Sequence, residues 1–144
     1  MPESIMNLSV PLKQQLGENC PWLFEELGFV VVYHDYAPVS FGDSLVILES
    51  PVLRVRFVRD RGQVLAAVGS AADPGKWWPV TFVLEAVRGK LPEPNFELAA
   101  VAASVRDNLS GLIEAMGPKY AETKQELERG GAERTRRLQQ PRKA

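Results

Sequence analysis

The stretch LRVRFVRDRGQVLAAV, residues 53–68, decides the fold. Apolar and polar residues alternate on both sides of its charged centre, the period expected of strands with one buried face. The inward-facing positions are Leu53, Val55 and Phe57 before the centre, and Val64, Ala66 and Val68 after it. Asp60, Arg61 and Gly62 fit a three-residue hairpin loop in which Gly62 takes the positive φ of a bulge. We therefore predict two antiparallel strands here.

The same stretch offers a basic surface. Arg54 and Arg56 project from one face of their strand, about 7 Å apart, and Arg59 and Arg61 lie towards the hairpin tip. Together these four arginines could bind an acidic partner. The alternative is an exposed strand face whose arginines pair with neighbours such as Glu49, which would stabilise the fold only weakly.

Two further strands are expected before the hairpin. Residues 29–33 form a β-branched and aromatic run that is apolar on both faces, which favours a central strand. Residues 44–49 form the next strand. Because the connections are too short for crossovers, neighbouring strands should pair antiparallel. We predict an α+β fold, a four-stranded antiparallel meander flanked by N-terminal and C-terminal helices.

The helices after the sheet have clear start and stop signals. Trp77, Trp78 and Pro79 should open a helix, because proline is tolerated in a first turn. Gly89 should end that helix, and Asn95 can cap the next one. Two adjacent tryptophans cannot both face the same core. One of them could anchor a protein partner, or both could pack at the rim between sheet and helix.

The chain should form a single domain over residues 1–129, in which residues 119–129 make a polar helix that could protrude. Gly130 and Gly131 should release a flexible tail at residues 130–144. This tail holds five basic residues and one acidic residue, a net charge of +4, whereas the whole chain has −1. Such a tail could contact nucleic acid, although most are simply solvated. The C-terminal helices could also join two copies in a homodimer.

Catalytic signals are weak. His34 could act as a general base oriented by Asp35, but adjacent strand residues point to opposite faces. Tyr33, His34, Tyr36 and Asp43 are the alternative site for a small ligand or substrate. We therefore expect that the protein is not an enzyme.

No cofactor and no metal are expected. One histidine and one cysteine, Cys20, leave too few ligands for a zinc site. Residues 69–76, GSAADPGK, differ from a phosphate-binding loop in spacing, and Trp77 stands where serine or threonine is required. The start of the sequence has no signal-peptide pattern and no run reaches 18 apolar residues. We therefore expect a cytoplasmic protein with no membrane segment.

The central pattern carries a resemblance. LFEELGFVVVYHDYAPVSFGDSLVILES, residues 23–50, is followed by the hairpin and a Trp-rich helix start. Over residues 23–88 this resembles small uncharacterised bacterial α+β proteins. Some proteins of similar layout resemble immunity proteins, which neutralise toxins. The resemblance implies a non-catalytic protein-binding module, an immunity-like or antitoxin-like inhibitor or a small assembly subunit. It transfers no site residues. From the residues themselves, we expect the partner to contact Arg54, Arg56, Arg59, Arg61, Trp77 and Trp78.

Overall fold

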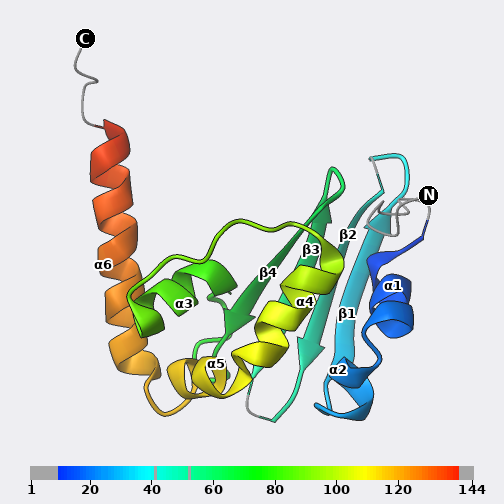
Figure 1. The fold of residues 1–144 in the computed structure, drawn as a ribbon, viewed down its shortest axis with the longest axis horizontal. Coiled ribbons are helices and arrows are strands. Elements are labelled where there is room, and N and C mark those ends of the chain that lie inside the picture. The colour runs from blue at the N-terminus through cyan, green and yellow to red at the C-terminus, as the bar shows by residue number, and fades with distance from the viewer. Residues whose placement is uncertain (1–9, 41, 52, 140–144) are drawn as a thin grey trace.

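The computed structural model describes residues 10–40, 42–51 and 53–139, with backbone only for 137–139. Within these residues it contains six helices and a five-stranded sheet (Figure 1). In chain order the elements are α1 (Leu12–Asn19), α2 (Trp22–Glu25), β1 (Val30–Ala37), β2 (Asp43–Glu49), β3 (Arg54–Asp60), β4 (Gln63–Gly69), β5 (Trp78–Pro79), α3 (Val80–Arg88), α4 (Leu98–Asp107), α5 (Leu109–Met116) and α6 (Tyr120–Gln139).

The sheet is a meander with the order β1-β2-β3-β4-β5, and every pair is antiparallel. The predicted α+β class is confirmed, but the sheet has a fifth strand. Trp78 and Pro79 pair with β4, although they were predicted to open a helix. Pro79 is extended, with φ −52° and ψ 134°, and α3 begins one residue later at Val80. A residue before proline avoids helical angles, and an edge strand tolerates the missing N–H.

The predicted hairpin joins β3 and β4, but its loop is shorter than expected. Asp60 lies opposite Gln63, so the loop holds only Arg61 and Gly62. Their φ angles are 52° and 84°, as in the tight turns whose twist suits a two-residue hairpin. The Arg61 backbone N–H donates to Asp43 Oδ1 at 2.9 Å. This hydrogen bond to β2 helps to hold a non-glycine residue in the left-handed region.

β1 lies at the edge of the sheet, so the prediction of a central strand was wrong. Its apolar side chains are largely in solvent: Val30 is 59%, Val32 50% and Tyr33 54% exposed. The register shifts between Val31 and Tyr33, an irregularity that discourages pairing with further strands. The run is apolar on both faces because its outward face belongs to a larger apolar surface.

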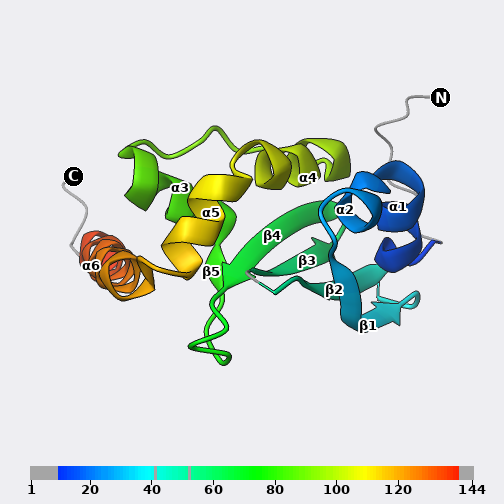
Figure 2. The ribbon, with the colours of Figure 1, turned by 90° about the horizontal axis from the view of Figure 1, so that it is seen from below.

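Helices α1 to α5 lie on one side of the sheet (Figure 2). The helix-covered face of the sheet is buried against them through Val46, Leu48, Val55, Phe57, Val64 and Val68. The helices contribute Leu12, Leu16, Leu23, Val83, Ala102, Val105 and Leu112, among others, to the same core. On the opposite face of the sheet, called the open face below, the loop between β4 and β5 projects, and none of the described helices lies there (Figure 2).

The helix expected after Asn95 is two helices. Asn95 Oδ1 accepts a hydrogen bond from the Glu97 N–H at 3.0 Å, and α4 begins one residue later. α4 and α5 meet at Asn108, whose side-chain amide donates to the Ser104 carbonyl at 2.8 Å. The predicted stop at Gly89 is confirmed, since this residue ends α3 with φ 76°.

α6 continues through Gly130 and Gly131 to Gln139, so these glycines do not end the helix as expected. The division into a domain over residues 1–129 and a separate tail stays a prediction. The continuation is held by Arg134, whose Nη2 lies 2.8 Å from Glu85 Oε1. Its guanidinium also lies 3.8 Å from the centre of the Phe82 ring. The end of the predicted tail, residues 140–144, lies outside the described residues. Pairing of two copies through α6 remains a prediction.

None of the helices among the described residues combines the length and apolarity needed to span a membrane.

Candidate protein-binding surface

The open face is built from alternate residues of four strands. In one row across the sheet, Tyr33 lies beside Ile47, then Arg56, then Ala67. The next row runs through Asp35, Leu45, Val58 and Leu65. Tyr33 and Leu65 are exposed, and most of the others are partly exposed. Apart from Asp35 and Arg56, these two rows are apolar, and no helix among the described residues lies over them.

Trp77 lies on this face between two arginines. The guanidinium carbons of Arg54 and Arg56 are 4.6 Å and 5.0 Å from the centre of its ring. These distances are within the range of cation–π attraction. The indole remains partly exposed. The sequence placed both arginines on the same strand face, and the structure adds an aromatic ring that lies beside them.

Gly69 makes room for the indole. It lies opposite Arg54 in the sheet. A Cβ at this position would lie 3.0 Å from the Lys76 carbonyl oxygen and 3.4 Å from Trp77 Cε3. The absence of a side chain therefore lets the end of the loop lie flat against the strand.

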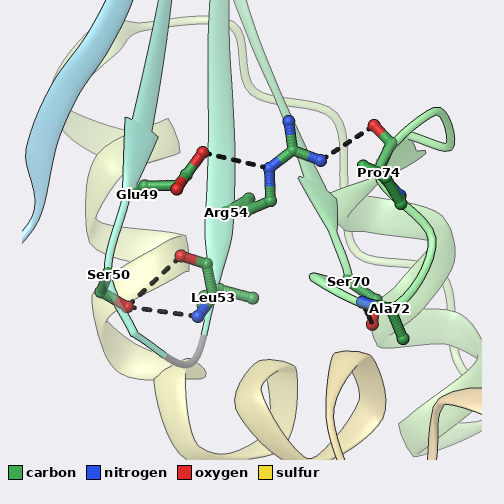
Figure 3. Close-up of polar contacts among 7 residues, drawn as sticks. All are labelled: Glu49, Ser50, Leu53, Arg54, Ser70, Ala72 and Pro74. Carbon is green, nitrogen blue, oxygen red and sulfur yellow. Dashed lines mark hydrogen bonds and ion pairs between the residues drawn. The ribbon is translucent and has the colours of Figure 1, made fainter.

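The loop itself is fixed on the strand side by Arg54 (Figure 3). Arg54 Nη1 donates to the Pro74 carbonyl at 2.9 Å, and Arg54 Nε lies 3.5 Å from Glu49 Oε2. Within the loop, the Ala72 N–H donates to Ser70 Oγ at 3.2 Å. Arg54 therefore has an acidic neighbour, as the alternative interpretation of the strand face expected.

The loop is fixed on its other side by α6. The Tyr120 hydroxyl donates to Asp73 Oδ2 at 2.6 Å, and Lys124 Nζ lies 3.0 Å from the same oxygen. These two hydrogen bonds hold the pKa of Asp73 below its usual value. Trp78 Nε1 in turn lies 3.3 Å from the Tyr120 hydroxyl oxygen. The adjacent tryptophans are thus separated, with Trp77 on the open face and Trp78 against α6.

Arg56 differs from Arg54 in having no acceptor. Among the described residues no hydrogen bond or ion pair to its guanidinium is found, and its Nε is buried without a partner. Orphaned buried donors are uncommon in folded proteins. An acidic group brought to this point would meet a cation whose one interaction among the described residues is with the Trp77 ring.

Arg59 does not belong to this surface. It shares the inner face with Val55 and Phe57 and is fully buried. Its guanidinium donates to the Gly42 carbonyl, to Gln15 Oε1 at 2.6 Å and to the Val10 carbonyl at 2.7 Å. Burial lowers the pKa of Arg59, while Tyr36 and Asp43 act in the opposite direction. The residue joins the N-terminal segment and the β1–β2 turn to the sheet.

Arg61 lies apart from the other arginines, at the exposed tip of the hairpin. Of the six residues expected to contact a partner, the structure therefore brings together Arg54, Arg56 and Trp77. The apolar part of the open face was missed. Residues 44–49 carry a signal for it, because Leu45 and Ile47 make this strand continuously apolar instead of alternating.

The alternative ligand site is not assembled. Tyr33 and Asp43 lie on the open face, in register with Ile47 and Ala37. His34 and Tyr36 lie on the other face, in register with buried positions of β2. Within the described residues, no group of three or more histidine, cysteine or acidic side chains could hold a metal ion.

Comparison with models of known protein families, with curated proteins and with solved structures gave no significant match.

Proposed function

We propose that this protein is a non-catalytic protein-binding module whose partner docks on the open face of the sheet. The observation that carries the proposal is the contact of Trp77 with both Arg54 and Arg56, on a sheet face that no helix among the described residues covers. Tryptophan, tyrosine and arginine are the residues most enriched at the energetic centres of protein interfaces. Tyr33 adds an exposed aromatic ring to the same surface.

The shape of the surface favours a macromolecular partner. Its apolar residues are spread over four neighbouring strands, from Tyr33 on β1 to Leu65 on β4. Contiguous exposed apolar surfaces of this kind commonly mark protein interaction sites. The hydrogen bonds of Asp73 and Arg54 fix the loop that presents Trp77, so little conformational entropy should be lost on docking.

The charges indicate what the partner brings. Glu49 lies 3.5 Å from Arg54, whereas no ion pair to Arg56 is found among the described residues. We infer that the partner places a carboxylate opposite Arg56, within an otherwise apolar contact. Such complementarity would speed association and fix the orientation of the complex.

An inhibitor of the immunity or antitoxin type, or a small assembly subunit, is the class of binding module that we propose. The sequence resemblance supports this class, whereas the separation of Tyr33 and Asp43 from His34 and Tyr36 onto opposite faces argues against the alternative ligand site.

The test compares recovered partners between matched variants of the full chain. Tyr33→Asp and Arg56→Glu alter the open face. Val87→Asp is the control, because Val87 on α3 is 49% exposed, close to the 54% of Tyr33, and lies away from the open face.

Tagged variants are used to recover binding proteins from the native host, and the proteins are quantified by mass spectrometry. We expect at least one protein to be recovered with the wild type and with Val87→Asp, and to be lost with both open-face variants. Equal recovery with all four chains, or no reproducible recovery with the wild type, would exclude the proposed surface. Thermal denaturation of each variant verifies that it is folded.

A further inference from the structure

We propose that a cavity beside β4 binds a small organic acid, a molecule with an apolar body and one carboxylate that pairs with Arg56. This goes beyond docking of a protein on the open face, because the cavity extends past the edge of β4 to α3 and α4. It shares Arg56, Val58, Leu65 and Ala67 with the open face, so the small acid and the protein partner would compete for Arg56. Its volume is about 510 Å³, within the range of roughly 300–1,000 Å³ typical of ligand sites.

The cavity exists because the outer edge of β4 is only partly covered. β5 pairs with β4 at Ala67 and Val68. At the other end, the Val64 N–H donates to the Phe96 carbonyl at 2.9 Å. Between these two points the register assigns no partner strand to β4, and the cavity occupies this gap. It is closed further by α3, α4 and the linker before α4.

The lining is mainly apolar and is open to solvent. Leu65, Leu91 and Phe96 all line the cavity, and they are 44%, 46% and 40% exposed. These are large side chains whose exposure to water is unfavourable. A bound apolar molecule would cover all three at once, with Val101 of α4 as the inner wall.

Arg56 lies at the side of the cavity that adjoins the open face. Its guanidinium has no acceptor among the described residues, which leaves its positive charge available to a carboxylate. The lining also includes one acid, Glu93, which is exposed. The negative charge of Glu93 would weaken the binding of an anion. Replacing Glu93 by a neutral residue is therefore a second test that the ligand is negatively charged.

The ends of the gap favour a small molecule over a peptide strand. An extended peptide added to a sheet edge needs several consecutive unpaired backbone groups. Here β5 and Phe96 cover β4 on both sides of Leu65 and Ala66. A strand could therefore pair with at most this short segment, whereas a compact ligand fits beside it.

The experiment is a titration of the full-length, ¹⁵N-labelled chain, followed by the chemical shifts of its backbone amides. The probes are sodium octanoate, octan-1-ol and octyltrimethylammonium, which share one apolar chain and differ in charge. We expect shifts around Leu65, Phe96 and Val101, and binding of octanoate at least about tenfold tighter than octanol, the effect of one charge-assisted hydrogen bond. The cation should bind weakest.

Variants of the chain test whether Arg56 causes the preference for octanoate over octanol. Arg56→Met should remove the advantage of octanoate over octanol, and Arg56→Lys should retain part of it. Glu93→Gln should strengthen octanoate binding, and Val101→Phe should weaken binding of all probes by filling the cavity. Equal binding of acid and alcohol to the wild type, shifts confined to other regions, or no binding would each overturn the proposal.

The outcome is separable from that for the protein-binding surface. Tyr33→Asp should leave octanoate binding unchanged, since Tyr33 does not line the cavity. Val101→Phe should leave recovery of the protein partner unchanged. Either proposal can therefore fail while the other stands.

Discussion

Replacing Arg59 by methionine measures what the buried guanidinium contributes to the fold. Methionine preserves most of the aliphatic length and removes every donor. The donors lost are Nε and Nη2 to the Gly42 carbonyl at 3.0 and 2.8 Å, Nη1 to Gln15 Oε1 at 2.6 Å, and Nη2 to the Val10 carbonyl at 2.7 Å. The N-terminal segment and the β1–β2 turn would then lose their direct link to β3.

The magnitude follows from the three acceptors that the described residues show for this guanidinium, which are the Gly42 and Val10 carbonyls and Gln15 Oε1. Gly42 and Gln15 are buried and Val10 is partly exposed. Leaving a buried acceptor unpaired costs about 1–3 kcal/mol. The Val10 carbonyl can recover a hydrogen bond to water, and removing a buried charge returns part of its desolvation cost. We therefore expect a decrease of about 3–5 kcal/mol in the free energy of unfolding, a large fraction of the roughly 5–15 kcal/mol of an ordinary domain.

Urea denaturation followed by tryptophan fluorescence measures this change. With a slope of about 2 kcal/mol per M, the midpoint should fall by about 1.5–2.5 M. Arg61→Met is the matched control, two residues away at the exposed hairpin tip. It should shift the midpoint by no more than about 0.25 M, because surface substitutions change stability by about 0.5 kcal/mol or less. If Arg59→Met shifted it no more than this control does, Arg59 would not be a structural link.

Three further predictions concern the loop and the C-terminal helix. Gly69→Ala should displace Trp77 and destabilise the fold by about 1–2 kcal/mol, because its Cβ would lie 3.0 Å from a carbonyl oxygen; indole chemical shifts and urea midpoints measure the two effects. The folded-state pKa of Asp73 is lowered. The stability that its carboxylate contributes to the fold is therefore present above the unfolded pKa of about 3.9 and is lost as pH falls through the folded pKa. In thermal melts recorded at a series of pH values, Asp73→Asn should therefore lose less stability than the wild type below about pH 4. If both chains lost the same stability at low pH, the Asp73 carboxylate would not contribute as proposed. Replacing Gly130 and Gly131 by alanine should stabilise α6 by about 1–2 kcal/mol, since neither position has a backbone clash, and a lower melting temperature by circular dichroism would contradict this.

The parts of the fold that the sequence predicted are those with a regular period. The β3–β4 hairpin follows directly from alternation around Asp60. Trp78 and Pro79 are too short a strand to show any period, so β5 could not be recognised. The edge position of β1 was missed because an apolar residue such as Tyr33 on the open face has the same pattern as one in a central strand.

The site was predictable to the extent that it depends on one strand. Arg54 and Arg56 share a face by parity, and the same parity already places Arg59 with the inward residues. The contact with Trp77 joins residues more than twenty positions apart and depends on the small size of Gly69. No local pattern encodes such a contact. The continuation of α6 likewise depends on Arg134 meeting α3, which helix propensity alone could not indicate.

The separation of the adjacent tryptophans gives the protein two independent optical reporters. Trp77 lies beside two guanidinium groups on the open face, and Trp78 lies against Tyr120 of α6. Emission from Trp77 should respond to whatever covers that face, and emission from Trp78 to the seating of the C-terminal helix. With Trp22 replaced by phenylalanine, the variant Trp78→Phe retains Trp77 and reports on occupancy of the open face. The variant Trp77→Phe retains Trp78 and reports on local unfolding of α6, and neither needs an attached dye.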